Sequence, residues 1–106
     1  MEMTYTSKNR ELTVHLQGEL DHHAARGAMV KLEELTEQNL PRKLTLDLAG
    51  LSFMDSSGIA VVIRAKRRME TLGGSLEVTN IPRQAARVLE TAGLDRYLNL
   101  SLGGEA

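Results

Sequence analysis

Three consecutive polar residues, Asp55, Ser56 and Ser57, follow an apolar stretch and precede Gly58. They lie between a predicted strand and a predicted helix, where open α/β sheets usually place their sites. Each of these side chains could cap the helix by accepting hydrogen bonds from its free N–H groups. Alternatively, one serine could accept a phosphoryl group, because a helix N-terminus tolerates an added dianion. In that case Gly58 would leave space beside the hydroxyl for the active site of another protein.

A second polar group, Asp21, His22 and His23, offers other chemistry. Adjacent histidines lack the spacing that puts two metal ligands on one helical face, so we expect a helix cap here and no metal. A hydrolase could use Ser56 or Ser57 as nucleophile and one of the histidines as base. The serines do not stand in the Gly-x-Ser-x-Gly turn of such enzymes, which disfavours that interpretation.

Hydrophobic periodicity alternates between two and 3.6 residues along the chain. The predicted elements are strands at 3–7 and 12–16, a helix at 21–39, a strand at 44–48, a helix at 55–72, a strand at 76–78, a helix at 82–92 and a strand at 98–100. This order predicts an α/β domain with a mixed, mostly parallel sheet of four to five strands. Because the strands alternate polar and apolar residues, we expect the helices mainly on one face.

Local signals set several of these boundaries. Gly18 is expected to end the second strand, and Pro82 to be the first residue of the third helix. The apolar first turn of the second helix, residues 59–63, is expected to be sunk in the structure. Phe53 and Met54 are interpreted as core residues.

Bulk properties narrow the class of protein. The 106 residues suit one domain, 1–106, with 13 basic against 14 acidic residues and no cysteine. This balance disfavours nucleic-acid and membrane partners, and the lack of cysteine excludes disulfides. The longest apolar run, 59–63, is far too short to cross a bilayer. We expect a soluble cytoplasmic protein without a cofactor.

A basic run on the second predicted helix contains Arg64, Lys66, Arg67 and Arg68. Such runs usually form a solvated face, and the balanced total charge favours that interpretation. Binding of a nucleotide or another anion is the alternative.

Two motifs together indicate a family. The segments LSFMDSSG (51–58) and GELDHH (18–23), about 33 positions apart (51 − 18), resemble the bacterial anti-sigma factor antagonists of sporulation. Their domain is called STAS, after sulphate transporters and anti-sigma antagonists. The resemblance extends over nearly the whole chain, since 81–82 and 91–94 also match the family's last helix and its cap. The sequence stops soon after the last predicted strand, where many members continue with another helix.

The resemblance implies a partner switch. The unmodified protein would bind an anti-sigma factor that is itself a serine kinase, and so release the sigma factor. That kinase would phosphorylate Ser56, with Ser57 as the fallback acceptor, and a separate serine phosphatase would reverse the modification. The protein would then be a substrate and a ligand, not an enzyme.

The resemblance also implies a partner-binding surface. Glu19 and Asp21 could pair with arginines of the kinase. The alternative within the same family is an interaction module of another signalling pathway, with weak nucleotide binding. The residues expected to contact the partner are Glu19, Asp21, His22, His23, Asp55, Ser57 and Gly58.

Overall fold

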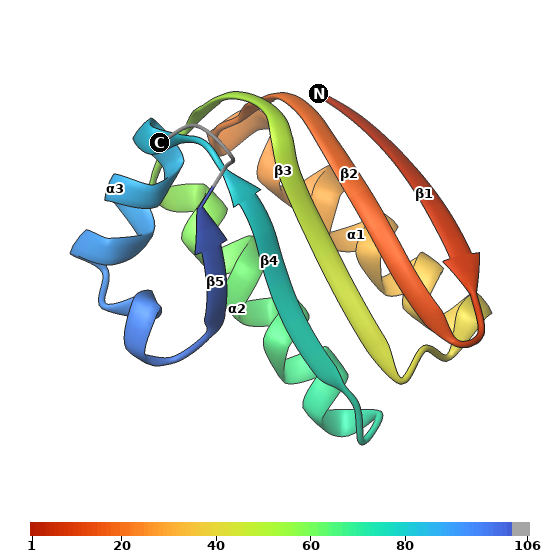
Figure 1. Cartoon of the computed structure of the whole chain (residues 1–106). Helices are drawn as coiled ribbons and strands as arrows, with labels where there is room; N and C mark the ends of the chain where they lie inside the picture. Colours follow the sequence, from red (N-terminus) through yellow and green to blue (C-terminus); the bar gives the residue numbers. More distant parts are fainter. Residues whose placement is uncertain (103–106) are drawn as a thin grey trace.

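The structure, a computed structural model, describes residues 1–102 and confirms the predicted α/β class (Figure 1). Residues 103–106 of the predicted domain lie outside the described part. The elements are β1 (Glu2–Lys8), β2 (Glu11–Leu20), α1 (His22–Asn39), β3 (Lys43–Met54), α2 (Ser56–Thr71), β4 (Ser75–Ile81), α3 (Arg83–Thr91), a 3-10 turn η1 (Leu94–Arg96) and β5 (Asn99–Leu102).

The five strands form one sheet in the order β1-β2-β3-β4-β5. β1 and β2 are antiparallel, and every later neighbour is parallel. Figure 1 shows α1 and α2 together behind the sheet, with α3 beside its β5 end. Within residues 1–102, no helix has both the length and the hydropathy that a bilayer span requires.

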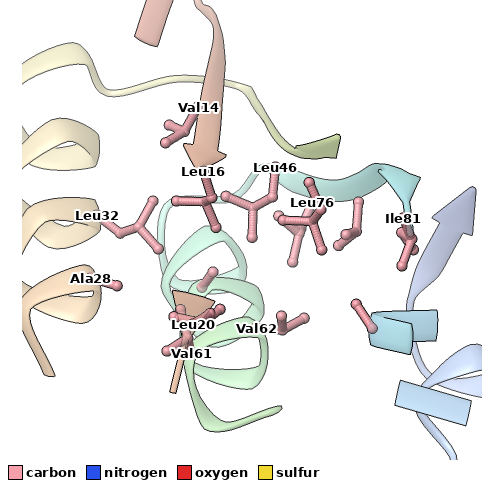
Figure 2. Close-up of a cluster of buried hydrophobic side chains, with 14 of the residues drawn as sticks. Val14, Leu16, Leu20, Ala28, Leu32, Leu46, Val61, Val62, Leu76 and Ile81 are labelled. Carbon is pink, nitrogen blue, oxygen red and sulfur yellow. The ribbon is translucent and has the colours of Figure 1, made fainter. Parts of the chain in front are cut away.

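The core lies between the sheet and the helices. Leu12, Val14 and Leu16 of β2 are buried, whereas Thr13 and His15 between them are only half-buried. Figure 2 shows Val14 and Leu16 gathered with apolar side chains from the neighbouring strands and helices. This alternation confirms that the helices cover one face, because only that face of the strands is fully apolar.

The helix-free face of the sheet carries a polar network centred on Asp47. Its carboxylate lies 3.1 Å from His15 Nδ1 and accepts hydrogen bonds from Asn80 Nδ2 (3.2 Å) and the Ala49 N–H (3.0 Å). Partial burial by itself would raise the pKa of Asp47, but these hydrogen bonds and the nearby imidazole together hold the pKa below its usual value. The network therefore ties β2, β3 and β4 together on the open face.

β2 and β3 both run further than the sequence predicts. Gly18 does not end β2: its φ of +103° lies in the region that favours glycine, and the register with β3 shifts between Gly18 and Glu19. A bulge of this kind bends a strand without ending it. β2 therefore reaches Leu20 and pairs there with Met54, so β3 also passes its predicted end at residue 48.

Two further predictions, on the burial of Phe53 and on the start of the third helix, are wrong. Phe53 has 41% of its surface exposed, although its neighbour Met54 is buried, because successive residues of a strand point to opposite faces. Pro82 has an extended ψ of 156° and precedes α3, which begins at Arg83.

The apolar stretch 59–63 near the start of α2 is not buried on all sides. Val61 and Val62 are buried, but Ala60 is exposed and Ile59 and Ile63 are only partly covered. A helix that lies on one face of a sheet keeps an outward side, and here that side is apolar.

Candidate functional site

The two sequence motifs meet at one edge of the sheet. β2 and β3 are parallel neighbours, and they end in register at Leu20 and Met54. Asp21 and Asp55 follow directly, and each is the N-cap of the next helix. The starts of α1 and α2 therefore lie side by side at the carboxyl edge of the sheet.

The Asp55 carboxylate links these two helices. Its Oδ1 accepts a hydrogen bond from the Ser57 N–H (2.8 Å), and its Oδ2 accepts one from the His22 N–H (3.1 Å). Its own N–H donates to the Leu20 carbonyl (3.3 Å). One side chain thus satisfies free N–H groups of both α1 and α2.

Asp21 has the capping role that the sequence predicts. Its Oδ1 accepts hydrogen bonds from the N–H groups of His23 and Ala24, both at 3.0 Å. The exposed rings of His22 and His23 contact each other edge to face, with centroids 5.6 Å apart. Among residues 1–102, no three potential metal ligands gather here or elsewhere.

The two serines differ in exposure. Ser56 is the first residue of α2 and is exposed, whereas Ser57 is half-buried and gives its N–H to Asp55. Ser56 lies on the rim of an open hollow of about 460 Å³ between α2 and α3. The other lining residues are Ile59, Gln84, Arg87, Val88, Thr91 and Ala92.

Gly58 has a packing role that the sequence did not indicate. The residue is buried at the start of α2. A Cβ at this position would lie 2.6 Å from Met54 Cγ and 3.0 Å from Met54 Sδ. Glycine is therefore needed because α2 starts in close contact with the end of β3.

α3 supplies two residues that the sequence analysis missed. The Gln84 amide exchanges two hydrogen bonds with the backbone of Met54: Nε2 donates to the carbonyl and Oε1 accepts from the N–H, both at 2.8 Å. Arg87, one helical turn later, brings a cation to the hollow beside Ser56. No sequence signal marked either residue, because both are ordinary polar residues of an amphipathic helix.

The structure brings the remaining predicted residues to the same edge. Glu19 is exposed near the end of β2, where it pairs in register with Phe53. In the described part of the chain, no hydrogen bond joins Ser56 or Ser57 to either histidine of α1. The arrangement therefore lacks the nucleophile–base contact of a hydrolase.

Two residues of the basic run of α2, Arg64 and Arg68, contact α1. Arg64 forms an ion pair with Glu33 (3.1 Å), and Arg68 Nε donates to Thr36 Oγ1 (3.1 Å). Lys66 pairs with Glu70 of its own helix at 3.8 Å, and Arg67 is exposed. Exposed residues and ion pairs of this kind favour the predicted solvated face.

Comparisons with known proteins agree with this geometry. The STAS domain profile matches residues 2–103. The anti-sigma F factor antagonist of Paenibacillus polymyxa is 32% identical over 87 residues, which cover 82% of this chain and 74% of the relative. SpoIIAA, an anti-sigma factor antagonist solved in its unphosphorylated form, superposes with a TM-score of 0.80 at 27% identity and covers 93% and 87% of the two chains. The phosphorylated form of the Bacillus cell fate determinant SpoIIAA superposes with a TM-score of 0.72 at 26% identity. That match covers 93% of this chain and 90% of the SpoIIAA chain. The chain belongs to the STAS domain family.

Proposed function

We propose that this protein is an anti-sigma factor antagonist that binds an anti-sigma factor serine kinase and is switched off by phosphorylation of Ser56. The observation that carries the proposal is the exposed Ser56 at the start of α2, directly after the Asp55 cap. The names of its relatives and the two solved forms of SpoIIAA support the proposal.

Exposure and hydrogen bonding favour Ser56 over Ser57 as the acceptor. A kinase must place the attacking hydroxyl in line with the γ-phosphoryl group of its nucleotide, so the hydroxyl has to be reachable. Ser56 is exposed on the rim of the hollow. Ser57 is half-buried and its backbone is held by Asp55, so the same approach would require the helix start to open.

The surface around Ser56 suits protein docking. Phe53 stands exposed two residues before the cap, and Ile59 and Val88 contribute apolar surface to the hollow. Apolar anchors surrounded by polar groups are typical of binding hot spots. Glu19 and Asp21 at the same edge would pair with cationic groups of the partner.

The charge of a phosphate is sufficient to block this docking. A phosphoserine adds roughly −1.5 to −2 charges at neutral pH, beside the carboxylate of Asp55. Against an acidic group or the nucleotide phosphates of the partner kinase, two unit charges about 4 Å apart at an effective dielectric of about 20 repel by roughly 4 kcal/mol, before screening by salt. A loss of about 4 kcal/mol weakens binding roughly a thousandfold.

The switch should work with little change in the backbone. The hydrogen bonds of Asp55 and Gln84 hold the strand end and both helix starts in place. Added charge at an exposed helix start leaves these contacts intact, so the surface itself would become repulsive. Amide chemical shifts of the two forms test this: large changes far from Ser56 would contradict it.

Phosphorylation is tested first by incubating the protein with its kinase and ATP and mapping the product by mass spectrometry. We expect the phosphate on Ser56, and no incorporation into Ser56→Ala. Ser57→Ala is the matched control, which should still be phosphorylated. Modification of Ser57 alone would refute the assignment. Treatment with the proposed serine phosphatase should restore the unmodified mass.

Partner binding is tested by calorimetry with the same kinase. Wild type and Ser56→Ala should bind with affinities within a few fold of each other. Ser56→Asp should bind at least tenfold more weakly, because it brings a negative charge to the docking surface. Equal binding of Ser56→Asp and wild type, or full binding by the phosphorylated protein, would refute the switch.

A further inference from the structure

β1 lies at one edge of the sheet, with β2 on one side only (Figure 1). All of its residues except Met3 are exposed, and Tyr5 has 46% of its surface exposed. An edge strand of seven residues offers a row of free backbone groups for pairing with another strand. Natural edges are usually protected by charges, prolines or bulges, and β1 has only its charged ends, Glu2 and Lys8.

The hairpin determines which backbone groups of β1 are free. Asn9 and Arg10 both have positive φ values, 54° and 63°, as a two-residue type I′ turn requires. Lys8 and Glu11 close that turn, and closing pairs of this type exchange hydrogen bonds. Because hydrogen bonding alternates along an antiparallel pair, every second residue of β1 points its N–H and C=O away from β2. These outward residues are Met3, Tyr5 and Ser7.

We propose that β1 pairs antiparallel with β1 of a second copy of this chain, around a two-fold axis at Tyr5. The strand sequence, Glu-Met-Thr-Tyr-Thr-Ser-Lys, is complementary to itself in that register. The pairs formed are Glu2 with Lys8, Met3 with Ser7, Thr4 with Thr6, and Tyr5 with Tyr5.

The backbone and the charges select the same register. Tyr5 on the axis is an outward residue, and so are Met3 and Ser7, so the hydrogen-bonded pairs coincide with the free backbone groups. Glu2 and Lys8 then fall at non-hydrogen-bonded positions, where side chains of opposite strands come closest. Opposite charges directly across a strand pair stabilise it, and the two-fold axis forms this ion pair twice.

The two faces of the pair also match. Tyr5 lies opposite the buried Val14 and therefore on the helix-covered side of the sheet. There it would meet its own symmetry mate, and aromatic cross-strand pairs stabilise sheets. Thr4 and Thr6 would pair across the helix-free face.

The resulting dimer is closed and leaves the Ser56 site free. Pairing around the two-fold axis leaves no free β1 edge, and it joins the two five-stranded sheets into one. Because the paired strands run in opposite directions, the two copies of Ser56 point to opposite ends of the joined sheet. One strand pair buries less area than a standard protein interface, so we expect a weak dimer. The proposal is independent of the proposed switch.

Sedimentation velocity from about 10 μM to 1 mM protein tests the dimer. Glu2→Lys and Lys8→Glu each place like charges across the interface twice and should weaken dimerisation at least tenfold. The double variant Glu2→Lys/Lys8→Glu exchanges the two charges and should restore the wild-type constant to within about threefold. Lys31→Glu, an exposed reversal on α1, is the matched control and should dimerise like wild type.

Tyr5→Pro is a second probe. It removes an outward N–H without removing a hydrogen bond to β2, so the variant should remain folded by circular dichroism and be monomeric. The proposal is overturned if wild type is monomeric throughout this range. It is also overturned if the single reversals leave the constant unchanged, or if the charge exchange fails to restore it.

Discussion

The Asp55 carboxylate holds two helix starts at once, and its replacement by alanine tests that arrangement. Asp55→Ala removes the hydrogen bonds to the N–H groups of Ser57 (2.8 Å) and His22 (3.1 Å). The first contact is an ordinary N-cap within α2. The second reaches α1, which is 33 positions away in the sequence.

The size of the effect follows from these two contacts. Loss of an N-cap side chain costs about 1 kcal/mol of stability, within a range of roughly 0.5–2. A hydrogen bond to a charged group contributes about 1.5–3 kcal/mol, and we take the lower end because the His22 contact is exposed. The sum is about 2–3 kcal/mol. Asp21→Ala is the matched control, because Asp21 caps α1 alone and should cost about 1 kcal/mol.

Urea denaturation measures the difference. With a slope of about 2 kcal/mol/M, Asp55→Ala should lower the midpoint by roughly 1–1.5 M, and Asp21→Ala by about half a molar unit. Asp55→Asn keeps only one acceptor oxygen and should fall between wild type and Asp55→Ala. Hydrogen exchange adds a local readout: the His22 amide should exchange faster in Asp55→Ala, although the substitution lies in another segment.

Two results would refute this reasoning. One is a stability loss in Asp55→Ala no larger than that in Asp21→Ala. The other is an unchanged exchange rate at His22, which would mean that the two helix starts are not coupled through the carboxylate.

Other predictions follow from packing and from titration. Gly58→Ala should destabilise the protein by about 1–2 kcal/mol, because its Cβ would lie 2.6 Å from Met54 Cγ. The matched control is Gly27→Ala in α1, where an added Cβ meets nothing within 4 Å, and it should stabilise the protein by up to about 1 kcal/mol. If the urea midpoints of both variants shift in the same direction, the packing argument is wrong. Folding lowers the pKa of Asp47 below 3.8. The ionised carboxylate therefore stabilises the fold above that pH, and this stabilisation is lost as the pH falls through the pKa of the folded state. Asp47→Asn should therefore be less stable than wild type at pH 7, with a difference that shrinks below about pH 4; a constant difference in melts from pH 3 to 7 would argue against it.

Local patterns were sufficient to predict the class of fold. Alternation of polar and apolar residues in the strands predicted helices on one face, and the structure confirms it. The caps at Asp21 and Asp55 were predictable because a cap acts within its own helix turn. These features depend on neighbours a few residues away, which a sequence displays directly.

Strand ends were harder to predict. Glycine often ends a strand, and Gly18 was predicted to do so. β2 nevertheless continues, because residues of β3 as far as Met54 pair with it. The exposure of Phe53 follows from the same extension, since it places the side chain opposite the buried face. Pairing with a neighbouring strand outweighed the local preference of one residue.

Composition, spacing and periodicity alone determined the α/β class, the two capped helix starts and the serine pair between them. Only the tertiary structure decided that Asp55 reaches His22, that Gln84 holds the backbone of Met54, and that Gly58 is buried against β3. Those contacts join segments about 30 positions apart, or depend on how α2 is seated on the sheet. Their geometry exists only after the parallel strands have paired in register, because strand pairing places distant residues within hydrogen-bonding distance.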